Sequence, residues 1–260
     1  MEKTVTSVLE YLYEKIKYGP ICMCVIDPEF GDKDELVELA TIAQKDGAHL
    51  IAVGGSTGIY STFVDELIKE MKNEITIPIV IFPSNVWSMS KEADAIFFIT
   101  LANTRDPYFA WKLNALLAPL VKKYGIEVIP TWYMLFEPGM TAGLVSSAEL
   151  LPRDFVNELT LGCAITGELL GYKFLILECG SRAPKPISPK VVSEIRKNVK
   201  TPLIVGGGIR TSKDTEVLIK AGADVIDIGR VLEKRKSIKN IMKVIKKYRK
   251  KENIVFRREG

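Results

Sequence analysis

The sequence is poor in the residues from which metal centres and disulfide frameworks are built. It holds one histidine, His49, and four cysteines, with no C-x-x-C pair among them. A zinc site or a disulfide framework needs several such residues at suitable spacing, so we expect neither. Cys22 and Cys24 alternate along an apolar run, and we interpret them as small core residues. His49 lies in a turn that enters a predicted strand, and we interpret it as structural.

Long apolar runs and a strong excess of one charge are also missing. No apolar run approaches the roughly 18 residues of a membrane-spanning helix, and the first residues lack the layout of a signal peptide, so we expect a cytoplasmic protein. The 36 basic and 32 acidic residues are mostly interspersed, which argues against a nucleic-acid partner. The exception is a basic run at 243–251. We interpret it as the solvated end of the last helix, with contact to an anionic membrane surface as the alternative.

The chain does contain short β-branched runs that alternate with helical patterns. Its 260 residues match the length typical of one (β/α)8 barrel. Strands are predicted at 21–26, 50–53, 78–82, 95–100, 127–135, 174–177, 203–205 and 225–228. Helices are predicted at 3–17, 34–45, 61–73, 108–124, 155–170 and 189–198. This alternation predicts an α/β fold, a single (β/α)8 TIM barrel over residues 1–260.

The alternation breaks once, after the third predicted strand. Residues 83–94 show no convincing amphipathic face, so we expect a loop in place of the third helix. Such a gap would open the flank of the barrel, where Trp87 and Met89 would line an apolar groove. An ordinary solvated connector is the alternative.

Two strands that end in glycine predict a phosphate site. The run at 202–210 contains Gly206-Gly207-Gly208, and the run at 223–230 ends in Gly229 and Arg230. Glycines allow close backbone approach and positive φ, and the helix start that follows favours an anion. Paired phosphate loops after the last two strands recur in (β/α)8 barrels.

Polar residues follow other strands at the end where such barrels have their active sites. Asp27 ends the first strand, Ser56 and Thr57 follow the second, and Glu178 and the turn 180–181 end the sixth. Together they offer an acidic residue with hydroxyls for a hard cation, a carboxylate base and a phosphate cradle.

The alternation of side chains along a strand supports this set. Asp27 shares a face with Met23, and Glu178 shares a face with Ile176. An acidic group directly after an apolar run needs a partner or a chemical role, which favours a functional Glu178.

At this point the motifs resemble those of the geranylgeranylglyceryl phosphate synthase family, over about residues 20–233. The matching motifs are Asp27-Pro28, Val53-Gly54-Gly55-Ser56-Thr57-Gly58, Ala93-Asp94-Ala95-Ile96-Phe97-Phe98, Glu137-Pro138-Gly139, Leu177-Glu178-Cys179-Gly180-Ser181 and Ile204-Val205-Gly206-Gly207-Gly208-Ile209-Arg210. Members of that family are (β/α)8 barrels whose third helix is replaced by a loop.

The resemblance implies an Mg²⁺-dependent prenyltransferase of lipid biosynthesis. It would transfer a geranylgeranyl group from geranylgeranyl diphosphate to the 3-hydroxyl of sn-glycerol 1-phosphate, the first ether bond of archaeal membrane phospholipids. Asp27 and Ser56 would hold Mg²⁺, and Glu178 would be the general base. A homo-oligomer, dimer or larger, is implied as well.

The resemblance also implies the substrate-binding residues. Those for the glycerol phosphate would be Gly180, Ser181, Gly207, Gly208 and Gly229, with Tyr133 near the site. The matching positions Ile176, Arg182 and Arg230 belong to the same predicted substrate-binding set. Candidates for an apolar groove around the prenyl tail are Phe97, Phe98, Tyr108, Trp111 and Trp132, with an ordinary core role as the alternative.

Four positions depart from the family pattern. Ile176 replaces a tyrosine, Arg182 replaces a glycine, and Arg230 replaces a small or polar residue. The two arginines would substitute charge-assisted bonds for the lost hydroxyl. The alternatives are that they crowd the site or select a different anion. Asp227 is also unusual, because a carboxylate would repel a nearby phosphate unless a cation compensates. These departures leave two alternatives open, a catalytically lapsed phosphate-binding paralogue and a phosphosugar isomerase-like barrel enzyme.

Overall fold

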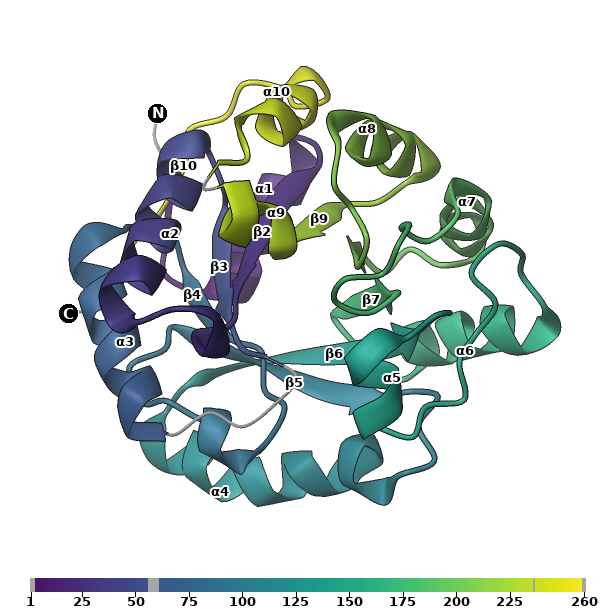
Figure 1. Cartoon of the computed structure of the whole chain (residues 1–260), viewed down its shortest axis with the longest axis horizontal. Helices are drawn as coiled ribbons and strands as arrows, with labels where there is room; N and C mark the ends of the chain where they lie inside the picture. The colour runs from purple at the N-terminus through teal and green to yellow at the C-terminus, as the bar shows by residue number, and fades with distance from the viewer. Residues whose placement is uncertain (1–2, 56–60, 236, 259–260) are drawn as a thin grey trace.

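A computed structural model of the chain describes residues 3–55, 61–235 and 237–258. A closed barrel of parallel strands, paired in chain order, lies inside a ring of helices (Figure 1). The barrel strands are β2 (Ile21–Ile26), β3 (Leu50–Val53), β4 (Ile79–Ile81), β5 (Ala95–Leu101), β6 (Glu127–Leu135), β7 (Phe174–Glu178), β8 (Leu203–Gly206) and β9 (Val225–Ile228). The predicted (β/α)8 architecture is confirmed.

The outer ring consists of α-helices. They are α2 (Lys33–Asp46), α3 (Ser61–Glu74), α4 (Leu113–Tyr124), α6 (Glu158–Leu169), α7 (Pro189–Asn198), α8 (Ser212–Ala221) and α10 (Lys239–Lys247). Local signals set their ends: α2 begins with a capping box between Asp32 and Glu35 and ends at Gly47, whose φ of 110° is left-handed. Within the described ranges, the helices are all too short or too polar to cross a bilayer.

Side chains alternate between two apolar cores, one inside the barrel and one between the strands and the helices. Met23 lies in the inner core, whereas Cys22 and Cys24 lie in the outer core, as expected. The Nδ1 atom of His49 accepts a hydrogen bond from the Cys22 N–H at 3.2 Å, and burial holds the pKa of this histidine well below its usual range. His49 is therefore a neutral structural residue.

The segment between β4 and β5, residues 82–94, is described in full and contains no α-helix. Its one regular turn is the 3-10 helix η2 (Val86–Ser88), and the Ser90 hydroxyl anchors the loop by donating to Asp65 Oδ1 at 2.5 Å. The predicted replacement of the third helix by a loop is confirmed. The groove predicted at Trp87 and Met89 is not: Trp87 is 67% exposed, while Met89 is buried in the outer core.

The amino-terminal segment differs from the prediction of one helix over 3–17. Residues Lys3–Val5 form strand β1, which pairs in parallel with β10 (Ile254–Phe256), and the helix α1 covers only Val8–Lys17. The main-chain bonds run from Lys3 N–H to Asn253 O at 2.8 Å and from Arg257 N–H to Val5 O at 3.0 Å. The apolar side chains of these segments join the inner core, so they close the barrel at the end where its strands begin.

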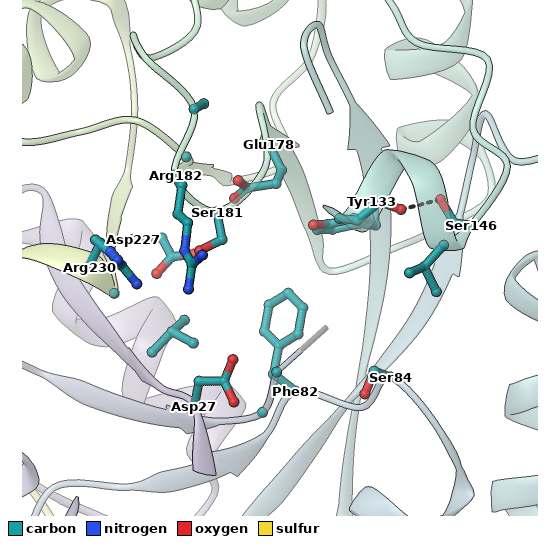
Figure 2. A pocket seen from close by; sticks show the side chains of 18 of the residues that line it. Asp27, Phe82, Ser84, Tyr133, Ser146, Glu178, Ser181, Arg182, Asp227 and Arg230 are labelled. Carbon is teal, nitrogen blue, oxygen red and sulfur yellow. Dashed lines mark hydrogen bonds between the residues drawn. The ribbon is translucent and has the colours of Figure 1, made fainter. Parts of the chain in front are cut away.

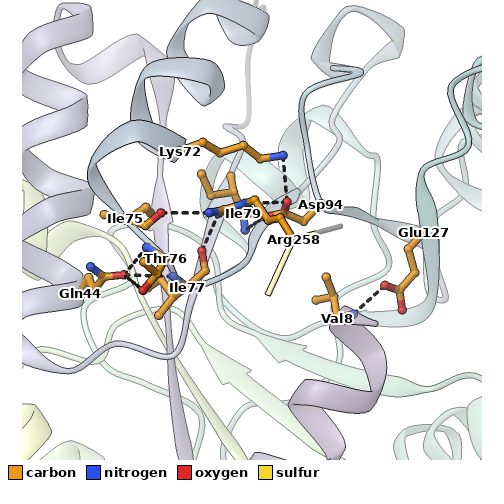
Figure 3. Close-up of polar contacts among 10 residues, drawn as sticks. All are labelled: Val8, Gln44, Lys72, Ile75, Thr76, Ile77, Ile79, Asp94, Glu127 and Arg258. Atoms are coloured by element: carbon orange, nitrogen blue, oxygen red, sulfur yellow. Dashed lines mark hydrogen bonds and ion pairs between the residues drawn. The ribbon is translucent and has the colours of Figure 1, made fainter. Parts of the chain in front are cut away.

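Polar contacts hold this closure in place (Figure 3). The Arg258 guanidinium reaches Asp94, just before β5, at 2.9 Å and donates to the carbonyls of Ile75 and Ile77. At the start of β6, the Glu127 carboxylate accepts the N–H of Val8 at 2.6 Å and so caps α1.

Several element boundaries also differ from the predictions. The helix predicted at 155–170 begins at Glu158, because the Asn157 side chain caps it by accepting the Thr160 N–H. The helix predicted at 108–124 begins as a π-helical turn, η3 (Tyr108–Lys112), before α4. The last helix ends at Lys247, short of the basic run's end. The helix start predicted after Gly229 is the short helix α9 (Arg230–Arg235), whereas another short helix, α5 (Met140–Val145), was not predicted.

Candidate active site

A pocket opens where the carboxyl ends of the barrel strands meet (Figure 2). One part of its lining is charged or rich in glycine, and the other part is mainly apolar. The first part comprises Asp27, Glu178, Ser181, Arg182, Gly207, Gly208, Asp227, Gly229, Arg230 and Glu233. The apolar part comprises Phe82, Ile99, Leu101, Phe109, Leu113, Tyr133, Ala142 and Val145.

Glu178 ends β7 and points into the pocket, as the strand alternation predicts. Its Oε1 atom accepts the Gly180 N–H at 2.6 Å, which favours the charged form. Burial acts in the opposite direction more strongly and raises the pKa of Glu178 to about 7. A Cβ atom at Gly206 or Gly207 would lie only 2.3 Å from a Glu178 oxygen, so these glycines provide the space that the carboxyl occupies.

The loop after β8 forms the predicted cradle beside this carboxyl. Gly207 and Gly208 have φ values of 77° and 75°, which only glycine adopts without strain. The Arg210 side chain holds the loop by donating to the carbonyls of Ala183 at 2.8 Å and Pro184 at 3.1 Å. Gly229, at the end of β9, completes the same wall of the pocket.

Two arginines from different loops meet at one aromatic ring. The guanidinium carbons of Arg182 and Arg230 lie 5.2 and 5.7 Å from the ring centroid of Phe30, which belongs to the 3-10 helix η1 (Pro28–Phe30). Arg230 also pairs with Glu233 at 3.5 Å. Arg182 has a φ of 71°, the left-handed conformation that the expected glycine would adopt freely. Two cations held this close together favour an anion at the mouth of the pocket.

Asp27 lies at the same mouth, directly after β2. Its Oδ1 accepts the Glu29 N–H at 3.1 Å, and burial together with Glu29 and Glu233 raises its pKa to about 6. Gly55 makes room for it, since a Cβ there would lie 2.2 Å from Asp27 Oδ1. Ser56, the second predicted Mg²⁺ ligand, lies outside the described residues.

The donor chemistry at Asp27 suits a hard cation that brings its own phosphate ligands. Mg²⁺ is commonly bound by one or two carboxylates together with substrate phosphates. Among the described residues there is no cluster of three or more His, Cys, Asp or Glu side chains arranged for a metal ion. The Asp27 carboxylate therefore fits Mg²⁺ as one ligand among others.

Two predicted substrate residues do not line the pocket. Ile176 is buried in the inner core, one inward position before Glu178 on the same strand. The Gly180 N–H donates to the Glu178 carboxylate and favours its charged form. Tyr133 does line the pocket, where its ring packs edge-on against Phe82 at 5.9 Å. Burial and the nearby carboxyls raise the pKa of Tyr133 well above its usual range.

The aromatic residues predicted for the apolar groove are elsewhere. Phe97 is buried in the inner core below the pocket, and Trp132 is buried under α6, where its indole N–H donates to the Cys163 carbonyl at 2.9 Å. Phe98 and Tyr108 pack against the outer core, and Trp111 is 61% exposed.

The residues that form the apolar lining were missed. Ile99 and Leu101 share the inward face of β5 with Phe97 and lie further toward the pocket end. The strand alternation could have identified both. Phe82 shares the inward face of the predicted strand 78–82 with Val80, so the alternation could have identified it too, whereas Phe109, in η3, carries no comparable signal.

Comparisons with known proteins agree with this geometry. The model of the PcrB family matches residues 14–248. The geranylgeranylglyceryl phosphate synthase of Thermococcus kodakarensis is 38% identical over 232 residues, which cover 89% of this chain and 92% of that protein. The synthase of Methanobrevibacter smithii is 39% identical over 233 residues, with coverage of 89% and 92%.

Solved structures give the same result. The synthase of Thermoplasma acidophilum, in complex with its substrate sn-glycerol-1-phosphate, superposes with a TM-score of 0.90 at 34% identity, covering 94% of this chain and all of that one. An N-acetylmannosamine-6-phosphate 2-epimerase from Clostridium perfringens shares the fold alone, with a TM-score of 0.56 and 14% identity over 85% of this chain and 91% of that one. The resemblance carried by the sequence motifs is confirmed, and the chain belongs to the PcrB family.

Proposed function

We propose that this protein is a prenyltransferase that joins the geranylgeranyl group of geranylgeranyl diphosphate to the 3-hydroxyl of sn-glycerol 1-phosphate. The observation that supports this most directly is the position of Glu178. This buried carboxyl, with a pKa of about 7, lies between a glycine cradle for a phosphate and an apolar wall for a hydrocarbon chain. The relative from Thermoplasma acidophilum, whose substrate is sn-glycerol-1-phosphate, supports the acceptor.

Glu178 is the general base of the proposed reaction. A base with a pKa near the working pH is ionised in a large fraction of molecules and still holds a proton well. It accepts the proton of the acceptor hydroxyl while the hydroxyl oxygen attacks the first carbon of the prenyl group. The bond from that carbon to the diphosphate oxygen breaks, and the diphosphate leaves with the electron pair.

The cradle orients the acceptor for this attack. Backbone N–H groups at Gly207, Gly208 and Gly229, with the Ser181 hydroxyl, bind the phosphate of the glycerol phosphate. Arg182 and Arg230 add charge-assisted bonds to the same phosphate, in place of the hydroxyl that Ile176 lacks. With its phosphate fixed, the acceptor extends its free hydroxyls toward Glu178.

Asp27 and Ser56 would hold Mg²⁺ at the mouth of the pocket. A Mg²⁺ ion held by these residues would supply charge neutralisation to the diphosphate leaving group. Asp27 contributes an inward carboxylate that burial disfavours without a cation, which is why its pKa is raised to about 6.

The apolar part of the pocket supports the prenyl donor over a phosphosugar substrate. Ile99, Leu101, Phe109 and Leu113 present hydrocarbon surface next to the catalytic carboxyl. An isomerase of small phosphosugars has no use for such a surface, whereas a prenyl chain is desolvated by it.

The test is transfer from labelled geranylgeranyl diphosphate to sn-glycerol 1-phosphate, with sn-glycerol 3-phosphate, metal-free and Glu178→Ala samples in parallel. We expect an ether product that requires Mg²⁺, prefers the 1-phosphate and is lost in the variant. Binding of glycerol phosphate without turnover by folded protein would instead support the lapsed paralogue, and absence of both would overturn the proposal.

The family resemblance supports two further proposals, that the enzyme works in the cytoplasm and that it assembles as a homo-oligomer. Light scattering coupled to size-exclusion chromatography tests the second, since a mass near the 29.0 kDa of one chain would contradict it.

A further inference from the structure

Asp227 presents a buried polar atom that the fold leaves unused. Its carboxyl points from β9 into the pocket, and among the described residues its Oδ1 atom is buried with no hydrogen-bond partner. Burying a carboxyl oxygen without a partner costs free energy, so most such atoms in proteins are satisfied or have a functional role. The general base Glu178 does not explain this residue, because a prenyltransferase needs only one base.

Asp227, from β9, and Glu178, from β7, both line the pocket (Figure 2). A Cβ atom built on Gly206 would lie 2.9 Å from Asp227 Oδ2 and 2.3 Å from Glu178 Oε2, so the two carboxyls flank this one glycine. Among the described residues, Tyr133, from β6, also lies near both carboxyls, and the cationic side chains of Arg182 and Arg230 line the same pocket. Two carboxyls this close in a buried site do not both ionise, and together they retain one proton near neutral pH.

The retained proton belongs to the pair of carboxyls. Burial and the Glu178 charge raise the pKa of Asp227, and burial raises the pKa of Glu178. A protonated Asp227 does not repel a phosphate bound at Gly207 and Gly229. Its carboxylic acid group both donates and accepts hydrogen bonds, which is what a hydroxyl partner requires.

The cradle and the two carboxyls are joined through the backbone. Gly207 follows Gly206 in the loop after β8, and Gly229 lies two residues after Asp227 on the same face of β9. A ligand held by its phosphate at these glycines therefore directs its carbon chain toward both carboxyls. A three-carbon polyol phosphate has two free hydroxyls, one for each carboxyl.

We propose that Asp227 is a specificity-determining residue that binds the second free hydroxyl of a polyol phosphate acceptor while Glu178 binds the hydroxyl that reacts. The inference rests on the proposed function, because it assumes that the acceptor is a phosphorylated polyol. Because of Asp227, the protein should prefer acceptors with two adjacent hydroxyls over acceptors with one.

The test compares two ligands by isothermal titration calorimetry on the full chain. These are sn-glycerol 1-phosphate and propane-1,3-diol monophosphate, which keeps the phosphate and the reacting hydroxyl but lacks the hydroxyl between them. We expect the wild-type protein to bind the first roughly tenfold more tightly, the effect of one hydrogen bond at a buried polar group. Asp227→Val should bring the two affinities to within about twofold, because valine offers no hydrogen bond.

Two further variants separate recognition from general damage. Asp227→Asn keeps a neutral donor and acceptor in place and should retain most of the preference. Glu233→Gln changes the charge at the mouth of the pocket, where Glu233 pairs with Arg230, and should shift both affinities alike. Thermal unfolding of each variant shows whether the protein is folded.

The outcomes distinguish this inference from the proposed function. If folded wild-type protein binds both ligands equally, or if Asp227→Val keeps the preference, the role of Asp227 is wrong while the acceptor stands. If it binds neither ligand, the polyol phosphate acceptor is wrong, and the role of Asp227 fails with it.

Discussion

The two ends of the barrel differ in how many protein partners their buried carboxyl groups have. At the end where the strands begin, Asp94 accepts the Ile79 N–H at 2.8 Å and pairs with both Arg258 and Lys72 at 2.9 Å. At the opposite end, Asp227 has an oxygen with no partner among the described residues, and Glu178 accepts the Gly180 N–H.

This difference separates stability from function within one fold. A carboxylate whose oxygens are all matched by protein donors adds to the stability of the native state and has nothing left to offer a ligand. A carboxyl whose partners are missing lowers stability until a substrate supplies them, and its raised pKa makes it a proton acceptor near neutral pH. Changes at the two ends should therefore affect different measurements.

The largest effect is expected at the catalytic end. Glu178→Gln keeps the size of the side chain but removes the proton acceptor, so turnover should fall by about 10³-fold. Because glutamine carries no charge to bury, the melting temperature at pH 8 should stay the same or rise. Steady-state rates and thermal unfolding measure both. A large loss of stability in this variant would contradict the separation of the two ends.

Next in size is a change at the closed end. Arg258→Ala leaves Asp94 with Lys72 as its remaining cationic partner and removes donors from the carbonyls of Ile75 and Ile77. We expect a loss of about 3 kcal/mol in the free energy of unfolding, measured with urea. The rate per folded molecule should be unchanged.

Arg153→Ala is the matched control for that variant. Arg153 pairs at 2.7 Å with Asp154, whose side chain is 66% exposed, so its removal should cost less than about 1 kcal/mol. Equal losses from the two arginine variants would show that the partners of Asp94 do not matter for stability.

The space that Gly207 leaves for the Glu178 carboxyl can be tested separately. A Cβ at Gly207 would lie 2.3 Å from Glu178 Oε1, so Gly207→Ala should displace the carboxyl and reduce turnover by on the order of 10²-fold. Gly125→Ala is the control. Gly125 has a φ of 66° at the end of α4, and a Cβ atom there would meet no other atom within 4 Å. It should lose about 1 kcal/mol of stability and keep its activity. Equal activity losses in the two variants would refute the steric argument.

The pH dependence of the reaction sharpens the contrast further. With a Glu178 pKa of about 7, the value of kcat/KM for the acceptor should rise with pH and be about tenfold below its plateau at pH 6. The folded pKa is higher than the ordinary value of 4.5, so Glu178 stabilises the fold at low pH and loses this contribution as pH rises toward 7. The free energy of unfolding of Glu178→Gln should therefore fall less than that of the wild-type protein as pH rises over that range. A flat rate profile between pH 6 and 8 would exclude Glu178 as the base.

The smallest effect is expected at the mouth. Phe30→Ala removes the ring that Arg182 and Arg230 share, and each contact contributes about 0.5–1 kcal/mol at an exposed site. The KM for the acceptor should rise a few-fold with little change in kcat. Phe155→Ala, at a 60% exposed aromatic outside the pocket lining, should change neither.

The sequence predicted the site best where the information is local. Alternation along single strands correctly predicted that Asp27 and Glu178 point inward, and the glycine runs predicted the cradle at Gly207 and Gly208. The departures from the family pattern also include Asp227, which is a buried carboxyl in the pocket.

The rest depends on contacts between distant parts of the chain. Nothing near Lys3 indicates that it pairs with Ile254, so the local pattern predicts one helix over 3–17. The apolar lining combines Phe82, after β4, with Phe109, in η3, and only the closed barrel brings them together. The groove was predicted at large aromatic residues such as Trp132, but the size of a side chain does not indicate which way it points.

The pairing of β1 with β10 also determines how the protein responds to mechanical force. The two strands run in parallel, so the chain enters β1 at Lys3 and leaves β10 at Phe256, at opposite ends of the same short ladder. A pull on the two chain ends therefore loads the ladder along the strands, in shear, and its hydrogen bonds must break together instead of unzipping one by one. The same contact that closes the barrel thus acts as a clamp against extension, in series with the Arg258 anchor.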